Sequence, residues 1–339
     1  MQMRKLATRQ LGLVSMLAAA GLMVAACGGG VNSTESSAAP AAPASEAASA
    51  AASEAAPAAA ECGDWGVAMH AWVGYTASAQ VLTNVAESLG CNITQTTLDE
   101  AGVTYDAMEA GSVDVIVEDW GGGRWQEWVD RGAIKEVGSN GNVGLIGMFV
   151  PKWMADEYPD ITDGANLNKY ADLFKNSESG DKGAWYEGPP GYTTIGEKLI
   201  SANDLNYKII STGSEAALIE LFSAAEKNKT AALGYFYEPQ NFLAKVPLAR
   251  VNFPANDWTD AEKASGLTDY PQTQLQKLAT TKLMESGSPF ATLLTNFSWT
   301  NEDQNMVALD IENGMTPEEA AQKWIDANKD KVDAWLAAG

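Results

Sequence analysis

The sequence predicts an α/β protein of two lobes, each a mostly parallel sheet flanked by helices. Strand-like runs alternate with helix-patterned segments over most of residues 62–339. This alternation is typical of parallel sheets that are covered by helices on both faces. The same stretch also exceeds the usual size of a single domain, about 100 to 200 residues. We therefore expect two lobes rather than one.

The first residues have the parts of an export signal. Arg4, Lys5 and Arg9 form a basic start, an apolar stretch follows, and small residues precede Cys27. The apolar stretch is short for a membrane span of about 20 residues. The tetrapeptide VAAC, ending at Cys27, resembles a bacterial lipobox. We predict that residues 1–26 are a lipoprotein signal peptide and that Cys27 is lipidated; a plain signal peptide with a free thiol is the alternative.

Residues 27–61 consist almost entirely of Gly, Ser, Ala, Pro and Glu. A segment with no aromatic and almost no branched apolar side chains cannot form a core. We expect a disordered tether between the lipid and the folded part. The formal net charge of the chain is −22, which argues against nucleic acid as a partner.

The folded part begins with a strand-helix-strand pattern. Residues 66–72 and 92–98 are strand-like, and residues 76–90 between them have a helical pattern. Cys62 precedes the first strand and Cys91 precedes the second. Parallel strands of a right-handed unit start at the same edge of the sheet, which can bring the two cysteines within bridging distance. Export permits oxidation, so we predict a disulfide, with two unpaired thiols as the alternative.

The alternation continues along the chain. Residues 101–110 predict a helix, Gly111 a turn, and VDVIVEDW at 113–120 a strand. Further strands are predicted at GAIKEVG, VGLIGMFVP, GAWYEGPP and YKIISTG. We expect residues 62–150 and 251–339 to form lobe 1 and residues 151–250 to form lobe 2.

The C-terminal part is predicted to be helical. The segments TQLQKLATTKLMES, NEDQNMVALDIENG and TPEEAAQKWIDANKDKVDAWLAAG have helical patterns. Thr300 and Thr316 are the expected N-caps, because Asp303 and Glu319 stand three residues further on and complete capping-box patterns.

A run of aromatic and glycine residues, VEDWGGGRWQEW at 117–128, follows an apolar strand. Ligands of open parallel sheets bind beyond the carboxyl ends of the strands, which is where Trp120 falls. Trp125 and Trp128 have helical spacing, so we expect them to pack in the core. Glu118 and Asp119 point to opposite faces of the strand, so at most one of them can join Trp120.

Taken in order, these segments resemble the substrate-binding proteins of glycine betaine/proline betaine ABC transporters, the OpuAC-like family. Residues 296–335 resemble the last two helices of that family. YDAMEAGSVDVIVEDW resembles its helix and strand ending in an acidic-aromatic pair, and GMFVPKW its crossover strand. The resemblance covers most of residues 64–339 and implies a periplasmic-binding-protein-like fold of type II.

The resemblance also implies a function. Such proteins hold a quaternary ammonium group in a cage of aromatic rings between two lobes. A quaternary ammonium has no N–H donor, whereas ring faces attract its charge and its methyl groups. We expect an exported monomer, lipid-anchored to the outer face of the bacterial cytoplasmic membrane, that serves a membrane permease and ATPase. No cofactor, metal site or catalytic residue is expected.

The ligand-binding residues are assigned through this resemblance. Trp120 matches the cage tryptophan of the family, Tyr75 or Trp72 the ring after the first strand, and Tyr235 or Tyr237 the later wall. The family's glycine-proline-glycine turn corresponds to residues 185–199, where two prolines remove backbone donors. The predicted ligand-binding residues are Trp72, Tyr75, Trp120, Trp185, Gly191, Tyr192, Tyr235 and Tyr237. The predicted polar contacts are Glu118, Arg124, Glu187 and Thr193.

Among ligands, a betaine-type zwitterion is favoured over choline, and carnitine stays open. A secreted carbohydrate-active hydrolase is the alternative from another class, because sugar sites are also rich in tryptophan and carboxylates. A structural surface lipoprotein, without an aromatic pocket, is a third interpretation. His70 is the only histidine of the chain and is expected to lie in the core or at a strand edge. No GxSxG or P-loop motif is present.

Overall fold

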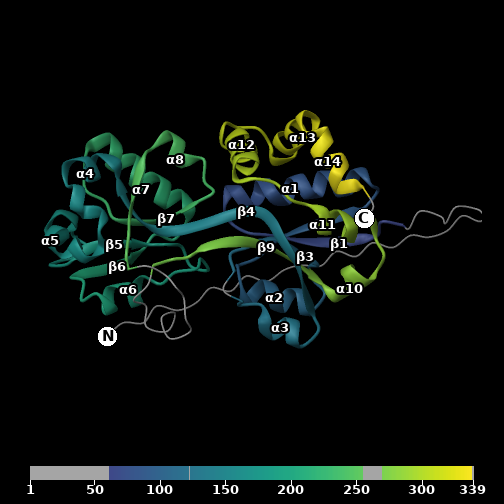
Figure 1. Ribbon diagram of the computed structural model, residues 1–339, viewed down its shortest axis with the longest axis horizontal. Coiled ribbons are helices and arrows are strands. Elements are labelled where there is room, and N and C mark those ends of the chain that lie inside the picture. Colours follow the sequence, from purple (N-terminus) through teal and green to yellow (C-terminus); the bar gives the residue numbers. More distant parts are fainter. Residues whose placement is uncertain (1–60, 122, 255–268, 338–339) are drawn as a thin grey trace, which may run out of the picture. The chain divides into compact units, whose positions relative to one another are not determined.

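The computed structural model describes residues 61–121, 123–254 and 269–337 (Figure 1). The predicted signal peptide, the lipidation site Cys27 and all but the last residue of the predicted tether lie outside the described residues. The described residues all belong to one compact unit.

Nine strands of the described part form one hydrogen-bonded sheet in the order β2-β1-β3-β9-β4-β7-β5-β6, with β8 paired to β4. The strands are β1 Asp64–Met69, β2 Asn92–Thr97, β3 Val115–Asp119, β4 Ile134–Pro151, β5 Gly183–Glu187, β6 Tyr207–Ser211, β7 Gly234–Glu238, β8 Leu248–Val251 and β9 Gln272–Thr280. The helices are α1 Val73–Ser88, α2 Gly102–Glu109, α3 Gln126–Asp130, α4 Lys152–Glu157, α5 Leu167–Tyr170, α6 Gly196–Ala202, α7 Glu215–Asn228, α8 Phe242–Lys245, α10 Thr281–Glu285, α11 Pro289–Asn296, α12 Asn301–Glu312, α13 Pro317–Ala327 and α14 Lys329–Leu336. Short 3-10 helices lie at η1 Pro159–Thr162, η2 Gly164–Asn166 and η3 Ala171–Phe174.

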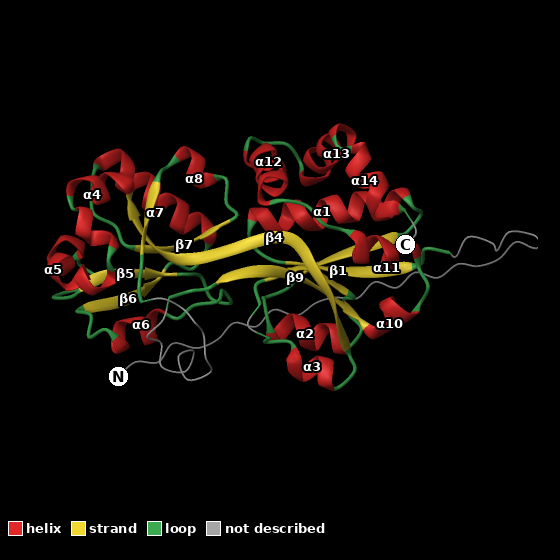
Figure 2. Cartoon of the chain, in the orientation of Figure 1, coloured by secondary structure: helices red, strands yellow, loops and turns green. Residues whose placement is uncertain are grey.

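Two parallel groups of strands make up the ends of this sheet. β1 pairs in parallel with β2 and β3, and β5 pairs in parallel with β6 and β7. Helices cover both faces of the first group, with α1 on one side and α2 and α3 on the other (Figures 1 and 2). The predicted fold class, α/β with parallel strands flanked by helices, is confirmed.

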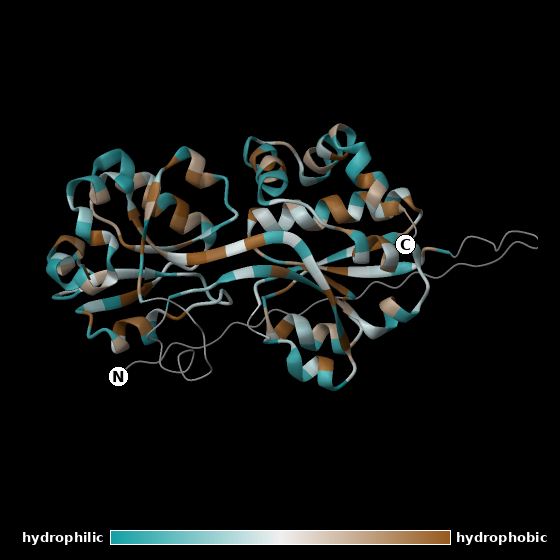
Figure 3. Ribbon diagram, viewed as in Figure 1, coloured by the Kyte–Doolittle hydropathy of each residue, from teal (hydrophilic) through white to brown (hydrophobic). Residues whose placement is uncertain are grey.

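The long strand β4 connects the two groups. Its first part pairs antiparallel with β9, and its last part pairs antiparallel with β7 and β8. The 18 residues of β4 span about 60 Å, which is long enough to reach both groups of strands. The sequence predicts two separate strands here; in the structure they are one strand with register shifts between Glu136 and Gly138 and between Ser139 and Val143. Figure 3 shows hydrophobic segments along β4, where Met148, Phe149 and Val150 are buried.

The helical prediction for TQLQKLATTKLMES is wrong in its first half. Residues 272–280 form β9, and only the last part forms the helix α10. β9 pairs with β3 on one side and β4 on the other, so its backbone donors and acceptors are used in the sheet. Tertiary pairing of this kind overrides a local preference for helix.

Both predicted capping boxes are confirmed. The Thr300 side chain accepts from the Asp303 amide, and the Thr316 side chain accepts from the Glu319 amide, with the reciprocal carboxylate bonds also present. The last stretch is divided at Asn328 into α13 and α14, so residues 296–335 contain three helices where the resemblance predicts two.

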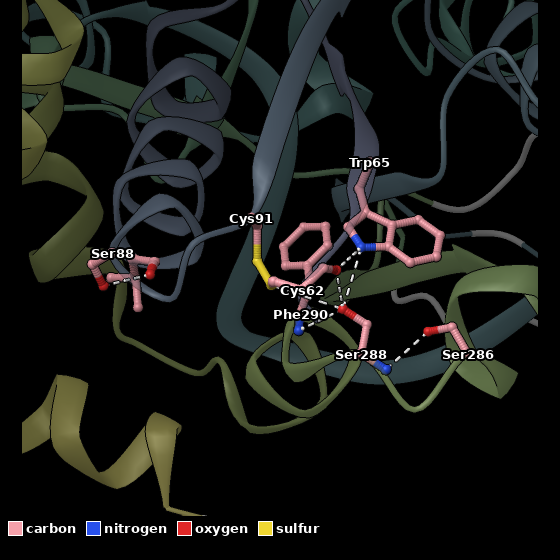
Figure 4. The surroundings of a disulfide bond; sticks show 8 residues. Cys62, Trp65, Ser88, Cys91, Ser286, Ser288 and Phe290 are labelled. Atoms are coloured by element: carbon pink, nitrogen blue, oxygen red, sulfur yellow. Dashed lines mark hydrogen bonds between the residues drawn. A yellow bond between two sulfur atoms is a disulfide. The ribbon is translucent and has the colours of Figure 1, made fainter. Parts of the chain in front are cut away.

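The predicted disulfide between Cys62 and Cys91 is confirmed, with the two Cα atoms 4.6 Å apart (Figure 4). The register of β1 and β2 explains it, because Asp64 lies opposite Asn92 and both cysteines come just before these residues. Trp65 donates its indole N–H to the Cys62 carbonyl over 2.6 Å. The Ser288 hydroxyl donates to the same carbonyl, which ties the disulfide to the start of α11.

Candidate ligand-binding site

A small cavity lies where residues from both groups of strands meet. The side chains that line it are Trp72, Glu100, Trp120, Ile146, Tyr192, Thr193, Tyr235 and Tyr237. Five of the eight are aromatic. The cavity therefore brings together residues that are more than 160 positions apart in the chain.

Three of the lining residues follow the carboxyl ends of neighbouring parallel strands. Trp72 comes three residues after β1, Glu100 three residues after β2, and Trp120 directly after β3. This edge of an open parallel sheet is the usual place for a ligand, because the loops there converge. Tyr192 follows the carboxyl end of β5 in the same way.

The other rings come from β7. Tyr235 and Tyr237 stand two residues apart on this strand, so their side chains share one face of the sheet. Phe236 between them points to the other face and packs against Phe222 and Phe242. Both tyrosines are almost completely buried. Local strand geometry therefore places both rings on the cavity, whereas the sequence leaves open which one closes it.

Neighbouring rings around the cavity meet edge to face. The ring centroids are 5.6 Å apart for Trp72 and Tyr192, 5.5 Å for Trp120 and Tyr237, and 6.1 Å for Tyr192 and Tyr237. Their interplanar angles are 75°, 86° and 76°. Edge-to-face contact is the arrangement that aromatic rings prefer, and a cation is attracted to the face of any such ring that it reaches.

Glu118 lies behind the two tryptophans. Its Oε1 accepts the indole N–H of Trp72 and of Trp120, each over 3.1 Å, and its Oε2 accepts the Ser78 hydroxyl over 3.0 Å. The side chain is completely buried. Burial raises its pKa to about 6, and the hydrogen bonds from Trp72, Ser78 and Trp120 limit the rise. At neutral pH the carboxyl is therefore mostly ionised, and it fixes both rings.

Glu100 is the charged group on the cavity wall, and sequence reasoning missed it. Its carboxylate binds Arg124 over 2.6 Å, and only 5% of its side chain is exposed. Burial raises the pKa of Glu100 to about 7, against the lowering effect of Arg124. Its position after the carboxyl end of β2 is the signal that could have found it.

A small charge network continues from Glu100 away from the cavity. Arg124 also lies 3.8 Å from Asp119, and Asp119 accepts the Tyr105 hydroxyl over 2.5 Å. Asp119 also accepts the amide of Gly121, a residue with a φ of 82°. That positive φ suits glycine, so the turn after Trp120 is set by Asp119 and Gly121 together.

Thr193 adds a hydroxyl group to the wall. Its Oγ1 is buried and has no hydrogen-bond partner among the described residues. A buried hydroxyl without a partner is costly, so this oxygen is available to a ligand or to water. Within the described part of the chain, no Lys, Arg or His lines the cavity.

Several predicted contacts lie outside the cavity lining. Tyr75 is fully buried, and its hydroxyl accepts the Val117 amide over 3.2 Å, so it holds the backbone of β3. Trp185 is fully buried against Tyr207 and Phe253. Of the alternatives left open by the sequence, the ring on the cavity after β1 is Trp72.

The remaining predicted polar residues also serve the protein itself. Glu118 binds the two indoles, Arg124 binds Glu100, and the buried Glu187 accepts the Gly188 amide over 3.2 Å. Gly191 has a φ of 91° and an exposed position in the turn that carries Tyr192. Each is therefore a support of the site and lies outside its wall.

His70 is buried and hydrogen-bonds through Nε2 to the Thr104 hydroxyl over 3.1 Å. Burial lowers its pKa to about 3, so the ring is neutral at physiological pH. No group of His, Cys, Asp and Glu side chains among the described residues could hold a metal ion. In the same part of the chain, no helix is both long and apolar enough to cross a membrane.

The fold and the cavity are those of a solute-binding protein, with a site at the edge of a sheet that helices flank. The chain belongs to the family described as the substrate-binding domain of ABC-type glycine betaine transport systems, OpuAC, which matches residues 66–327. It is 26% identical over 277 residues to the trimethylamine N-oxide-binding protein of Pelagibacter ubique, covering 78% of this chain and 87% of that protein.

Solved structures agree with this fold. Lactococcal OpuAC in its closed-liganded conformation with glycine betaine matches with a TM-score of 0.66 at 22% identity, covering 81% of this chain and 99% of the other. An ABC-transporter choline-binding protein in complex with choline matches with a TM-score of 0.66 at 18% identity, covering 81% and 92%. The protein is thus a substrate-binding protein of the family that serves ABC-type glycine betaine transport systems.

Proposed function

We propose that the cavity captures a small, fully methylated ammonium compound and that its aromatic rings hold the cationic head. The observation that carries this proposal is the convergence of five rings, from Trp72, Trp120, Tyr192, Tyr235 and Tyr237, on one cavity. A cation over an aromatic face gains about 0.5 to 2 kcal/mol for each ring. Several rings together can therefore supply most of the affinity without any hydrogen bond to the head.

The rest of the predicted function belongs to the same proposal. The protein is an exported, lipid-anchored monomer that delivers its ligand to a permease and an ATPase in the membrane, and it catalyses no reaction. The family match supports the transport role. The lipid anchor rests on the sequence around Cys27.

Glu100 bears on which ligand is bound. A zwitterion such as glycine betaine brings a carboxylate, which is repelled by an ionised Glu100 and finds no cationic side chain on the described wall. Choline brings a hydroxyl, which can donate to Glu100 or pair with Thr193. The betaine-type ligand predicted from the sequence stays a candidate, and Glu100 gives the choline alternative a specific physical basis.

Titration of intrinsic tryptophan fluorescence tests the proposal. The panel comprises glycine betaine, proline betaine, carnitine, choline, trimethylamine N-oxide and a set of simple sugars. We expect a saturable change with at least one methylated amine and none with the sugars. If no amine changes the fluorescence at millimolar concentration, the proposal is wrong. Hydrolysis of a sugar would favour the hydrolase interpretation.

An uncharged analogue isolates the contribution of the charge. 3,3-Dimethyl-1-butanol has the shape of choline with carbon in place of nitrogen. If rings hold a cation, the analogue binds at least tenfold more weakly than choline. Equal affinity would mean that the cavity selects an apolar shape alone. Trp128→Phe is the matched control variant, because Trp128 packs on Tyr105 outside the cavity.

A further inference from the structure

Glu215 connects two parts of the cavity wall that are far apart in the sequence. It is the first residue of α7, and its side chain is buried. Its Oε2 accepts the backbone amide of Val73, 142 positions away, over 3.2 Å. Val73 is the first residue of α1 and the direct neighbour of Trp72, one of the cavity rings.

The start of α1 has no cap from its own sequence. Its N-cap residue is Trp72, which is extended and whose side chain makes no capping hydrogen bond. The first amides of a helix need acceptors, and a negative charge is favourable there. Glu215 supplies both to the 16-residue helix α1 from outside it. α7 needs no help from Glu215, because the Ser214 side chain caps that helix.

The other oxygen of Glu215 binds residues of β7 and of the segment after it. Oε1 accepts the hydroxyl of Tyr237 and the side-chain amide of Gln240, the latter over 2.6 Å. The Tyr237 ring lines the cavity and meets Trp120 edge to face. One carboxyl therefore joins the backbone beside Trp72 to a ring carried by β7.

We infer that Glu215 is a positioning residue that latches the β7 side of the cavity to the start of α1 and so retains the ligand. It does not touch the cavity itself. The inference rests on the proposed function, because what the latch retains is the methylated ammonium compound. Loss of the latch lets the Trp72 and Tyr237 walls separate, which speeds ligand release more than it slows capture.

Glu312 makes two contacts with the segment after β7, and these contacts serve as a comparison for those of Glu215. Glu312 of α12 binds Lys245 over 2.9 Å and Asn241 over 3.0 Å, both from the segment after β7. Side-chain exposures of 48% for Lys245 and 22% for Glu312 place this pair near water. Exposed ion pairs contribute little, so Glu312 is not expected to control ligand release.

The test compares Glu215→Gln with Glu220→Gln, an exposed glutamate on the same helix, and with Glu312→Gln. An amide has one acceptor oxygen and a donor group, so it cannot serve three donors as the carboxylate does. Stopped-flow tryptophan fluorescence with the best-bound amine measures both rate constants. We expect Glu215→Gln to raise the dissociation rate at least tenfold with the association rate within threefold, and both controls to stay within twofold.

Tyr237→Phe is the second variant, because it keeps the ring and removes the hydroxyl that Glu215 binds. It should raise the dissociation rate, and combining it with Glu215→Gln should add little. An unchanged dissociation rate in both single variants overturns the latch while the proposed function stands.

Hydrogen exchange distinguishes a failure of the Glu215 latch from a failure of the proposed function. If the wild-type chain binds no amine, the proposed function fails, and exchange at the amides of residues 73–75 still decides whether Glu215 caps α1. Faster exchange there in Glu215→Gln, with the rest of α1 unchanged, supports the latch. Unchanged exchange overturns it.

Discussion

Trp72 and Trp120 donate their indole N–H groups to the same carboxylate oxygen, Oε1 of Glu118, each over 3.1 Å. The two rings come from loops after different strands, and the carboxylate between them sets their relative angle. It also puts a buried negative charge at the edge of both rings, which favours a cation in front of their faces.

Glu118→Gln should weaken binding of the best-bound amine about tenfold, because an amide oxygen can orient the rings but carries no charge. Glu118→Ala should weaken binding further. It should also lower the free energy of unfolding by about 1 to 3 kcal/mol, since two buried indole donors lose their acceptor. Fluorescence titration and urea unfolding measure the two effects. Ser78→Ala, which removes a different donor to Glu118, should keep affinity within threefold. Wild-type affinity in Glu118→Gln would contradict the charge argument.

Trp120→Ala should weaken amine binding at least tenfold, and Trp120→Phe should fall between it and the wild type, because a smaller ring keeps part of the cation attraction. Isothermal titration calorimetry gives the affinities, and circular dichroism checks that the fold is retained. Trp128→Phe serves as the control. If Trp120→Ala binds as tightly as the wild type, Trp120 is not part of the cage.

Binding of a cationic ligand such as choline should depend on pH through Glu100. A cation favours the ionised carboxylate, and the pKa of Glu100 is about 7, so affinity should rise as the pH increases from 6 to 8 and then level off. For glycine betaine the rise should be smaller or reversed, because the ligand carboxylate opposes an ionised Glu100. Titrations across this range check both trends. Glu100→Gln should flatten the change near pH 7, and an unaltered profile in that variant would exclude Glu100 as its source.

The carboxyl of Glu100 should also make the stability of the fold depend on pH. Here the effect is opposite in sign to that on choline binding, because the free energy of unfolding should fall as the pH rises. In the unfolded chain its pKa is near 4.5, whereas in the folded protein it is about 7. The folded state therefore binds more protons between these values, and this group lowers the free energy of unfolding as the pH rises from 4.5 to 7. The difference between wild type and Glu100→Gln should shift by about 1 to 3 kcal/mol across that window. Urea unfolding at pH 5 and pH 7.5 measures it; parallel curves would contradict the prediction.

The Cys62–Cys91 bridge closes a loop with a sequence separation of 29. Replacing both cysteines with serine should lower the free energy of unfolding by about 3 to 4 kcal/mol, because the unfolded chain regains the entropy of that loop. The disulfide lies at the amino ends of β1 and β2, opposite the edge that carries Trp72 and Glu100. Ligand affinity should therefore stay within twofold at a temperature where the variant is folded. A large loss of affinity would mean that the bridge sets the geometry of the cavity.

Local sequence patterns were enough to predict much of this protein. The alternation of strands and helices, the capping boxes at Thr300 and Thr316, and the pairing of Cys62 with Cys91 all depend on neighbours in the chain or on one strand-helix-strand unit. The end of β3 likewise predicted a place for Trp120 beyond the carboxyl edge of the sheet, and Trp120 does line the cavity there.

Tertiary structure alone decided the rest. Residues 272–280 became a strand because β3 and β4 offered hydrogen-bonding partners on both sides. The sequence singled out Glu118 as a polar contact but not the two indoles that it binds, and it gave no role to Glu100 or Glu215. These roles depend on burial and on partners up to 142 positions away. A carboxylate acquires its function from the donors that surround it, and those donors meet only when the chain is folded.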